Sequence, residues 1–435
     1  MCGIAPWRVA VVCSTALVAV GAACSACDVT PEQIQQWKGV EGGPRKLRAA
    51  VRNERLKPEV RVAAAEALVE LALTDDLAAE VKEMKPAAQA ALLQILVPKL
   101  IETARGSDPA AQPSRKQRNA KDALFVLRDP AQGAQKNAID TALIDWVTQD
   151  FSGRQTAGAH ASFKILKAIG PKAGPALVGL LKRPGPDLDA AAKLLGEIGD
   201  ETARNQGGEA LIELARKQKP IQEWTFVALG RVGGPAALKF LGDMVEKDKE
   251  RSLDAIKSLA IAPRPESLTL ALNTARNRKL DHAVRDLGLE IAAKIGGRAA
   301  AEGVAPLIDD PTYEISWHAF EVVLASLKAD GIPLAFEKLQ LRHLAKKDDV
   351  PDFLVKHVRD FGGAGAREKV LGQLESKNPA ARLAAVLCLD IIGTAADAPA
   401  VEKLGGDGTK IKGWPGGATI GSEARVAVEH MKKKR

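Results

Sequence analysis

The chain has 435 residues, of which 46% are hydrophobic and 27% charged, and its formal net charge is +8. It is long enough to bury a large core, but with only 4% aromatic residues that core must come from close packing of small side chains. The five cysteines exclude a disulfide framework and a paired CxxC zinc site, because Cys24-x-x-Cys27 has no second pair.

Residues 1–27 have the order of a targeting segment: Arg8, an apolar stretch at 9–20, small residues at 21–23, and then Cys24. This order resembles a bacterial lipoprotein signal, which implies lipidation of Cys24, with Cys27 as the alternative. Two other interpretations remain open, namely cleavage with secretion and an uncleaved anchor over about 9–27. We expect a membrane-anchored protein of the cell envelope, on the periplasmic or outer-membrane face, with secretion as the alternative.

The next segments alternate between polar and periodic. Residues 28–44 are predicted to be a tether, and 45–105 to form N-terminal helical repeats that include a clear helix at 58–73. The Pro/Ser/basic stretch 106–118 lacks periodicity and is predicted to be a flexible loop. Residues 119–157 are predicted to form a helical pair.

The most informative pattern lies at 160–181, HASFKILKAIGPKAGPALVGLL. Leu166 and Ile169 recur at helical spacing, and Gly170 followed by Pro171 is typical of a left-handed helix end. Pro175 then suits the first turn of a second helix. The segment therefore predicts two short helices joined by a tight turn.

This pattern recurs through 158–404. The equivalent turn glycines are Gly170, Gly199, Gly233, Gly296, Gly362 and Gly393. A period of roughly 30–35 residues containing two helices indicates an α-solenoid, in which each pair hides its apolar stripe only by stacking on its neighbours. We therefore predict an all-α fold built from stacked helix pairs.

Two of the units carry a family resemblance. The stretches 191–214 (AAKLLGEIGDETARNQGGEALIEL) and 378–404 (NPAARLAAVLCLDIIGTAADAPAVEKL) are similar to HEAT repeats, in particular the short phycobilisome-lyase-type variety. Arg285 and Arg382 each precede their turn glycine by eleven positions, as the recurrent arginine of that family does, and Arg61 and Arg425 match less completely. The resemblance covers about 45–435 and implies HEAT-like packing without implying a function.

The pattern breaks after the regular repeats. Residues 405–421 are predicted to be a Gly-rich loop that holds an isolated Trp414. Residues 422–435 read as a single capping helix that starts at Ser422 and ends in a basic tail. A terminal half-unit of this kind covers the last exposed stripe of a solenoid.

No catalytic constellation is visible. The sequence has no GxSxG, HExxH or Walker motif, and no nucleophile, base and orienting group can be nominated together. His318 and Glu321 lie three apart on a helix, but two ligands are too few for a metal site. We expect no enzyme activity, no cofactor and no metal.

Charge gives the one directional signal. Cations recur where second helices are expected to end, either to complement the helix dipole or to line up as a basic ridge along one edge of the stack. The ridge residues are Lys182, Arg183, Lys217, Lys219, Lys247, Lys249, Arg276, Arg278, Lys279, Lys346 and Lys347.

The favoured function is a non-catalytic scaffold that mediates protein–protein interaction in the cell envelope. The alternatives are binding of an anionic polymer such as nucleic acid through the basic ridge, and a chaperone-like lyase implied by the repeat resemblance. Export and the scarcity of aromatic residues for base stacking argue against nucleic acid.

Overall fold

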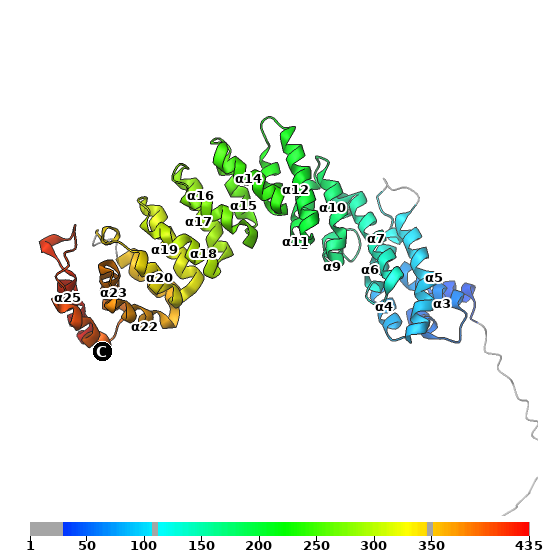
Figure 1. Cartoon of the computed structure of the whole chain (residues 1–435). Coiled ribbons are helices and arrows are strands. Elements are labelled where there is room, and N and C mark those ends of the chain that lie inside the picture. The colour runs from blue at the N-terminus through cyan, green and yellow to red at the C-terminus, as the bar shows by residue number, and fades with distance from the viewer. Residues whose placement is uncertain (1–28, 107–111, 346–350, 435) are drawn as a thin grey trace, which may run out of the picture. The chain divides into compact units, whose positions relative to one another are not determined.

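The computed structural model describes residues 29–106, 112–345 and 351–434. These residues form α-helices, short 3-10 helices and a π-helix at Pro351–Val355, with an isolated antiparallel bridge between Lys410 and Thr419 (Figure 1). They fall into two compact units, one of Met1–Trp146 with Thr156–His160 and the other of Val147–Gln155 with Ala161–Arg435. The all-α prediction is confirmed for the described chain.

The first unit holds two short rows of helices. Its helices are α1 (Pro31–Trp37), α2 (Gly43–Arg52), α3 (Pro58–Glu70), α4 (Thr74–Lys82), α5 (Pro86–Arg105), α6 (Arg115–Leu127) and most of α7 (Gly133–Gln149). Helix α3 packs between α1 and α5, while α4 packs between α2 and α6. Leu47, Leu68 and Leu96 are fully buried in this unit, as stacked amphipathic helices require.

Two segments of this unit differ from the sequence prediction. The expected tether 28–44 contains α1, which Thr30 caps and which buries Ile34. The predicted loop 106–118 ends four residues early, because Ser114 and Gln117 form a capping box that starts α6 at Arg115. In both places a capping side chain starts a helix that the weak apolar periodicity did not reveal.

The second unit is the regular array. Its α-helices are α8 (Phe151–Arg154), α9 (Ser162–Ile169), α10 (Gly174–Leu181), α11 (Leu188–Ile198), α12 (Glu201–Arg216), α13 (Glu223–Val232), α14 (Pro235–Lys247), α15 (Ser252–Ile261), α16 (Leu268–Arg276), α17 (His282–Ile295), α18 (Gly297–Val304), α19 (Tyr313–Leu327), α20 (Gly331–Lys338), α21 (Lys356–Gly362), α22 (Ala366–Leu371), α23 (Pro379–Ile392), α24 (Ala398–Glu402) and α25 (Ile420–Lys433).

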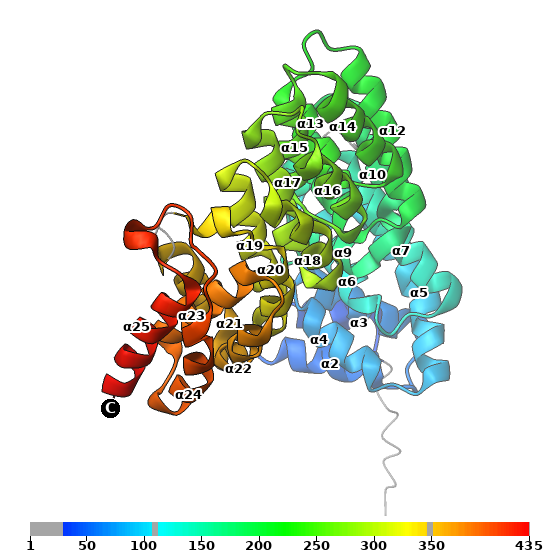
Figure 2. The ribbon, with the colours of Figure 1, turned by 60° about the vertical axis from the view of Figure 1, so that its left-hand side comes forward.

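Two rows of stacked helices make up this array. The first helices of the pairs contact one another in sequence order from α9 through α11, α13, α15, α17 and α19 to α21. The second helices do the same from α10 through α12, α14 and α16 to α18. Figure 2 shows α13, α15 and α17 in one row beside α12, α14 and α16 in the other. This is an α-solenoid of HEAT-like helix pairs.

The turn glycines serve two different purposes. Three of them have a positive φ, between 62° and 77°, which favours glycine: Gly170, Gly233 and Gly296. Gly199, Gly362 and Gly393 do not, since their φ values are −68°, −69° and −75°. After α21 the positive φ, 64°, falls on Gly363. A Cβ at Gly199 would lie 2.5 Å from the carbonyl oxygen of Leu195, so close approach of the backbone requires glycine there. The recurrent glycine of the sequence therefore has two physical causes, a positive φ in some turns and a close approach of the backbone in others.

The Gly-rich segment near the C-terminus is anchored. Trp414 is 6% exposed, and its indole N–H donates a hydrogen bond of 2.6 Å to the carbonyl of Leu344. Helix α25 starts at Ile420, two residues before the predicted start, because Thr419 is the N-cap and Ser422 completes its capping box. The predicted isolated Trp is instead a packed residue that ties this segment to an earlier repeat.

Candidate functional site

The described residues hold neither a metal-binding cluster nor a membrane-spanning helix. Within 29–106, 112–345 and 351–434, no three His, Cys, Asp or Glu side chains gather so that they could hold a metal ion. In the same ranges, no helix combines the length and the apolar character needed to cross a bilayer. Cys24 and Cys27 lie outside the described residues, so their lipidation stays a prediction. The candidate site described below lies on the surface of the repeats.

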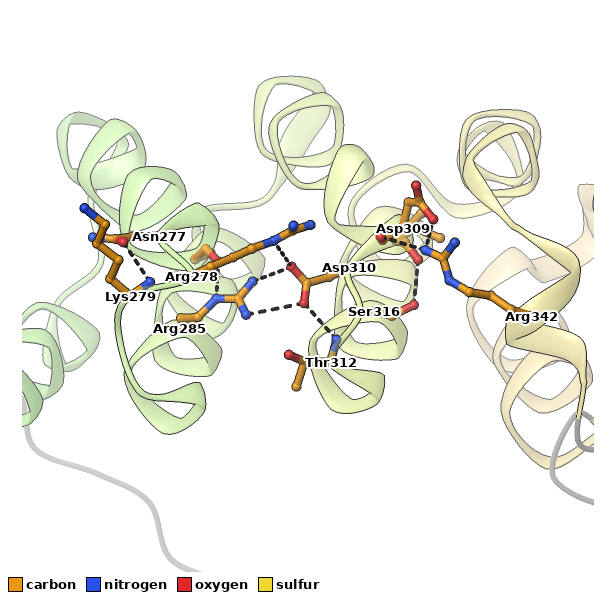
Figure 3. Close-up of polar contacts among 11 residues, drawn as sticks. Asn277, Arg278, Lys279, Arg285, Asp309, Asp310, Thr312, Ser316 and Arg342 are labelled. Carbon is orange, nitrogen blue, oxygen red and sulfur yellow. Dashed lines mark hydrogen bonds and ion pairs between the residues drawn. The ribbon is translucent and has the colours of Figure 1, made fainter.

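The recurrent arginine is structural. Arg285 is 4% exposed, and its Nε donates to the carbonyl of Ala275 at 2.8 Å, at the end of the preceding second helix. Its guanidinium also holds Asp310 of the next repeat, with N–O distances of 2.6 and 3.3 Å (Figure 3). Although burial acts in the opposite direction, Arg285 and the backbone N–H of Thr312 lower the pKa of Asp310.

The same arrangement recurs at Arg382, which lies twenty-five residues before Asp407, as Arg285 lies before Asp310. Arg382 donates from Nε to Asp407 at 2.9 Å and from Nη1 to the carbonyl of Ser376 at 2.9 Å. Arg61 makes the same contact with a backbone carbonyl: its Nε donates to the carbonyl of Val51 at 3.0 Å. These arginines connect one helix pair to the next and are not available to a ligand.

The described ridge residues lie at the ends of second helices or in the turns that follow them, with Lys247 and Arg276 as the last residues of α14 and α16. Lys346 and Lys347 fall outside the described residues. The other nine are exposed: Lys182, Arg183, Lys217, Lys219, Lys247, Lys249, Arg276, Arg278 and Lys279. Because second helices contact second helices in order, the turns after α12, α14 and α16 share one edge of the array, which is uppermost in Figure 1. We call this the inter-repeat edge.

Three ridge residues already have protein partners. The contacts are Arg278 with Asp310 at 3.4 Å, Lys247 with Asp243 at 2.5 Å, and Arg276 with the carbonyl of Gly303 at 2.5 Å. The hydrogen bond to Asp243 raises the pKa of Lys247. The exposed pair of Lys247 and Asp243 contributes little to stability, and all three contacts occupy cationic groups that would otherwise be open to a partner.

The remaining six cations make no ion pair with any residue of the described chain. Two of them, Lys182 and Lys217, are C-cap residues of α10 and α12, where a cation complements the helix dipole. The other four lie after the C-cap and before the next helix starts, namely Arg183 after α10 and three lysines after α12, α14 and α16. We call the three lysines the inter-repeat lysines: Lys219, Lys249 and Lys279.

The inter-repeat lysines occupy equivalent places. They follow one another at intervals of thirty residues and lie two or three residues after the ends of α12, α14 and α16. The dipole effect is confined to the last turn of a helix, and the next helix presents its positive end, so no local role accounts for these cations. Figure 3 shows the side chain of Lys279 directed away from Asp310, whereas Arg278 reaches it.

The predicted pair of His318 and Glu321 is split between different partners. His318 Nδ1 lies 2.5 Å from Asp286 on α17, and Glu321 lies 3.6 Å from His357 Nε2. Burial opposes the charge on His318, but Asp286, Glu321 and Glu290 outweigh it and raise the pKa of this histidine. These cross-helix pairs were missed because their partners lie more than thirty residues apart in sequence.

Comparisons with known proteins identify no family. No protein-family model matches the sequence, and no curated protein does. Among solved structures, an engineered protein is 18% identical, with 90% of this chain and 99% of that chain covered and a TM-score of 0.27. The karyopherin Kap121p, bound to the extreme C-terminus of the protein phosphatase Cdc14p, is 12% identical, with 93% of this chain and 46% of that chain covered and a TM-score of 0.34.

Kap121p on its own gives a similar result, with 12% identity, 92% and 42% coverage and a TM-score of 0.29. This chain therefore spans less than half of the length of Kap121p. Superpositions with such low TM-scores carry no argument about what this chain binds. What the inter-repeat edge can bind therefore follows from its own residues alone.

Proposed function

We propose that this chain is a non-catalytic scaffold that binds an acidic protein partner along the inter-repeat edge. The observation that carries the proposal is the row of inter-repeat lysines, which are exposed, lie thirty residues apart and form no ion pair with a described residue. The resemblance of 1–24 to a lipoprotein signal supports a place in the cell envelope, with the scaffold attached to a membrane through Cys24 or Cys27.

The physical argument is one of collective charge. Each lysine alone attracts an anion weakly in water, but equivalent positions in stacked repeats present several charges to one extended partner. The Debye length falls to about 8 Å at physiological ionic strength, so such binding weakens steeply as salt is added. A site that depends on apolar contacts would respond much less.

The test is a matched pair of triple variants. Lys219→Glu, Lys249→Glu and Lys279→Glu together reverse the inter-repeat lysines. The control reverses three exposed lysines on other elements: Lys257, Lys356 and Lys403. Both variants change the net charge by the same amount, so a difference between them reports position and not total charge.

The measurement is recovery of cross-linked partners from the native envelope at low and high salt, together with thermal melts of both variants. We expect the edge variant to stay folded and to lose its partner, while the control keeps it at low salt. Equal recovery by the two folded variants would remove the edge as the binding surface.

The same row of cations would attract a nucleic acid. Nuclease treatment of the cross-linked sample separates the two cases, because a protein partner remains bound and a nucleic-acid partner is lost. The favoured outcome is retention, since aromatic residues, on which bases could stack, make up only 4% of the chain.

A further inference from the structure

A groove in the first unit offers a second surface, independent of the inter-repeat edge. It lies between α5 and α7 and has a volume of about 430 Å³, within the range of ligand-binding pockets. Its apolar lining comes from six residues: Leu93, Val97, Pro98, Ile101, Ala134 and Ala138. Among the described residues that line it there is no aromatic ring, so aliphatic side chains give the groove its apolar character.

The lining follows the axis of α5. Leu93, Val97, Ile101 and Arg105 recur every four residues, so they form one stripe along the helix. With a rise of about 1.5 Å per residue, the stripe from Leu93 to Arg105 is about 18 Å long. On the other side of the groove, Ala138 is exposed on α7. This shape suits an extended apolar chain that lies along α5 better than a compact ring system.

The stripe ends in positive charge. Arg105 is the last residue of α5, and Gly106 lies against the side chain of Gln117 in the first turn of α6. The start of α6, which is also rich in cations, therefore borders the end of α5. We call the cations of these two helix ends the basic corner: Arg105, Arg115, Lys116 and Arg118. They form no ion pair with a described residue, although Arg118 donates to the carbonyl of Pro113 at 2.8 Å.

Two acids lie near the basic corner. Glu102 lines the groove one turn before Arg105. Asp145 is exposed on α7, seven residues after Ala138 and therefore on the same side of that helix. Four cations against these two acids leave an excess of two positive charges. Asp108 lies outside the described residues, and counting it still leaves the excess positive.

The other acids on the helices packed here are already paired. Asp122 on α6 contacts Lys121 at 2.6 Å, and Asp140 on α7 contacts Arg128 at 2.5 Å. Glu66 on the neighbouring α3 pairs with Lys99 of α5 at 3.3 Å, so that pair adds no net charge. The N-terminus of α6 also presents the positive end of its helix dipole at the basic corner. The groove thus joins an apolar stripe to an anion-attracting end.

We propose that the groove between α5 and α7 binds an anionic phospholipid, with one acyl chain along the stripe and the phosphate at the basic corner. Basic pockets beside apolar surfaces hold the head groups of acidic lipids in this way. A zwitterionic lipid would bring an ammonium group to a corner that already has excess positive charge. The site would hold the first unit against the membrane to which Cys24 or Cys27 is expected to attach the chain.

The first experiment places a photo-reactive benzoylphenylalanine at position 138 of the full chain in its native cells. Ile261, 46% exposed on α15, is the control position. The proposal expects a phospholipid adduct from position 138 that is absent from position 261. A peptide adduct from a second copy or another protein, a link to the chain's own acyl group, the same adduct from both positions, or no adduct would overturn it.

The second experiment measures lipid affinity by native mass spectrometry of the full chain in a neutral detergent. Phosphatidylglycerol should bind at least about tenfold more tightly than phosphatidylcholine. Ala138→Trp, which fills the groove, and the pair Arg105→Gln with Lys116→Gln should each weaken phosphatidylglycerol binding at least about tenfold. Ala134→Leu supplies the same blockage if Ala138→Trp does not fold.

Two controls complete the test. The pair Lys257→Gln with Lys403→Gln removes the same charge from exposed positions on other elements and should leave lipid binding unchanged. Reversal of Lys219, Lys249 and Lys279 should also leave it unchanged, so failure of this proposal and failure of the edge are distinguishable. Equal affinity for the two lipids, equal affinity for all variants, or displacement of the lipid by inorganic phosphate would refute the assignment.

Discussion

Asp310 is the residue on which the inter-repeat contacts converge. Its carboxylate is fully buried, and it receives Arg285 at 2.6 Å, Arg278 at 3.4 Å and the backbone N–H of Thr312 at 2.9 Å. Removing one member of a buried ion pair leaves an uncompensated charge, which is far more costly than the pair was favourable. This side chain is therefore a sensitive place to test how one repeat is attached to the next.

We predict that Arg285→Met destabilises the second unit by about 3–5 kcal/mol. Arg298→Met, at an exposed pair with Glu302, should change stability by less than about 1 kcal/mol. Urea unfolding followed by circular dichroism measures both. Similar shifts for the two variants would show that the buried pair has no special role.

The lowered pKa of Asp310 gives a second prediction, in acid. A carboxyl whose folded pKa lies below its unfolded value of about 3.9 contributes stability that is complete at higher pH. That contribution is lost as the pH falls through the folded pKa. The difference in unfolding free energy between the wild type and Asp310→Asn should therefore shrink as the pH is lowered from about 6 to about 3, and a constant difference would contradict the assignment.

His318 should show the opposite dependence, because its pKa is raised. Its contribution is complete below the unfolded value of about 6.5 and is lost as the pH rises through the folded pKa. The stability difference between the wild type and His318→Gln should be largest near pH 6 and smaller near pH 8.

At the scale of the helix pair, close packing of small residues replaces aromatic bulk. Leu195 on α11 is fully buried, and its methyl groups approach the backbone at Gly207 of α12 and Gly174 of α10. A Cβ at Gly207 would lie 2.4 Å from a methyl group of Leu195 and would not fit, whereas a Cβ at Gly174 would meet Leu195 at an ordinary contact distance of 4.0 Å. One leucine thus holds three helices together.

We predict that Leu195→Ala costs about 2–5 kcal/mol, because the glycines around it cannot fill the space left behind. Gln112→Ala, at an exposed position before α6, should be nearly silent. Thermal melts of the two variants test the repeat register. Equal shifts would place Leu195 outside the core.

The sequence predicted the elements better than their junctions. The spacing of Leu166 and Ile169 predicted helix α9, and Gly170 predicted where it ends. Both signals are local, since they depend on apolar periodicity and on a turn with positive φ. The sequence could not separate Gly199 from Gly170, because close approach to Leu195 depends on packing. The ridge cations were identified, but their sorting into paired and unpaired members required Asp243 and Asp310, which lie on other turns of helix or in other repeats. The contact between the rings of Tyr313 on α19 and Phe353 was missed for the same reason, since these residues are forty positions apart and meet only in the folded chain.

At the scale of the whole molecule, attachment to a membrane depends on residues outside the described chain. We predict that the mature protein starts at Cys24 and carries acyl groups. Intact mass of the membrane-extracted protein measures this directly. Cys24→Ala should abolish the acyl mass, whereas Cys27→Ala should retain it. The reverse result would move the modification to Cys27, and an unmodified N-terminus elsewhere would exclude a lipoprotein.

The stacking of each helix pair on only its two neighbours has a consequence for how the inter-repeat edge measures distance. Lys219, Lys249 and Lys279 each belong to a separate pair, so the gap between two of them is set by the thickness of one unit. Duplicating or excising a complete pair would move every later lysine by one such step without disturbing the packing of the remainder. The spacing of the lysines along the inter-repeat edge is therefore a whole number of repeat thicknesses. The number of repeats sets the length of partner that the edge can match.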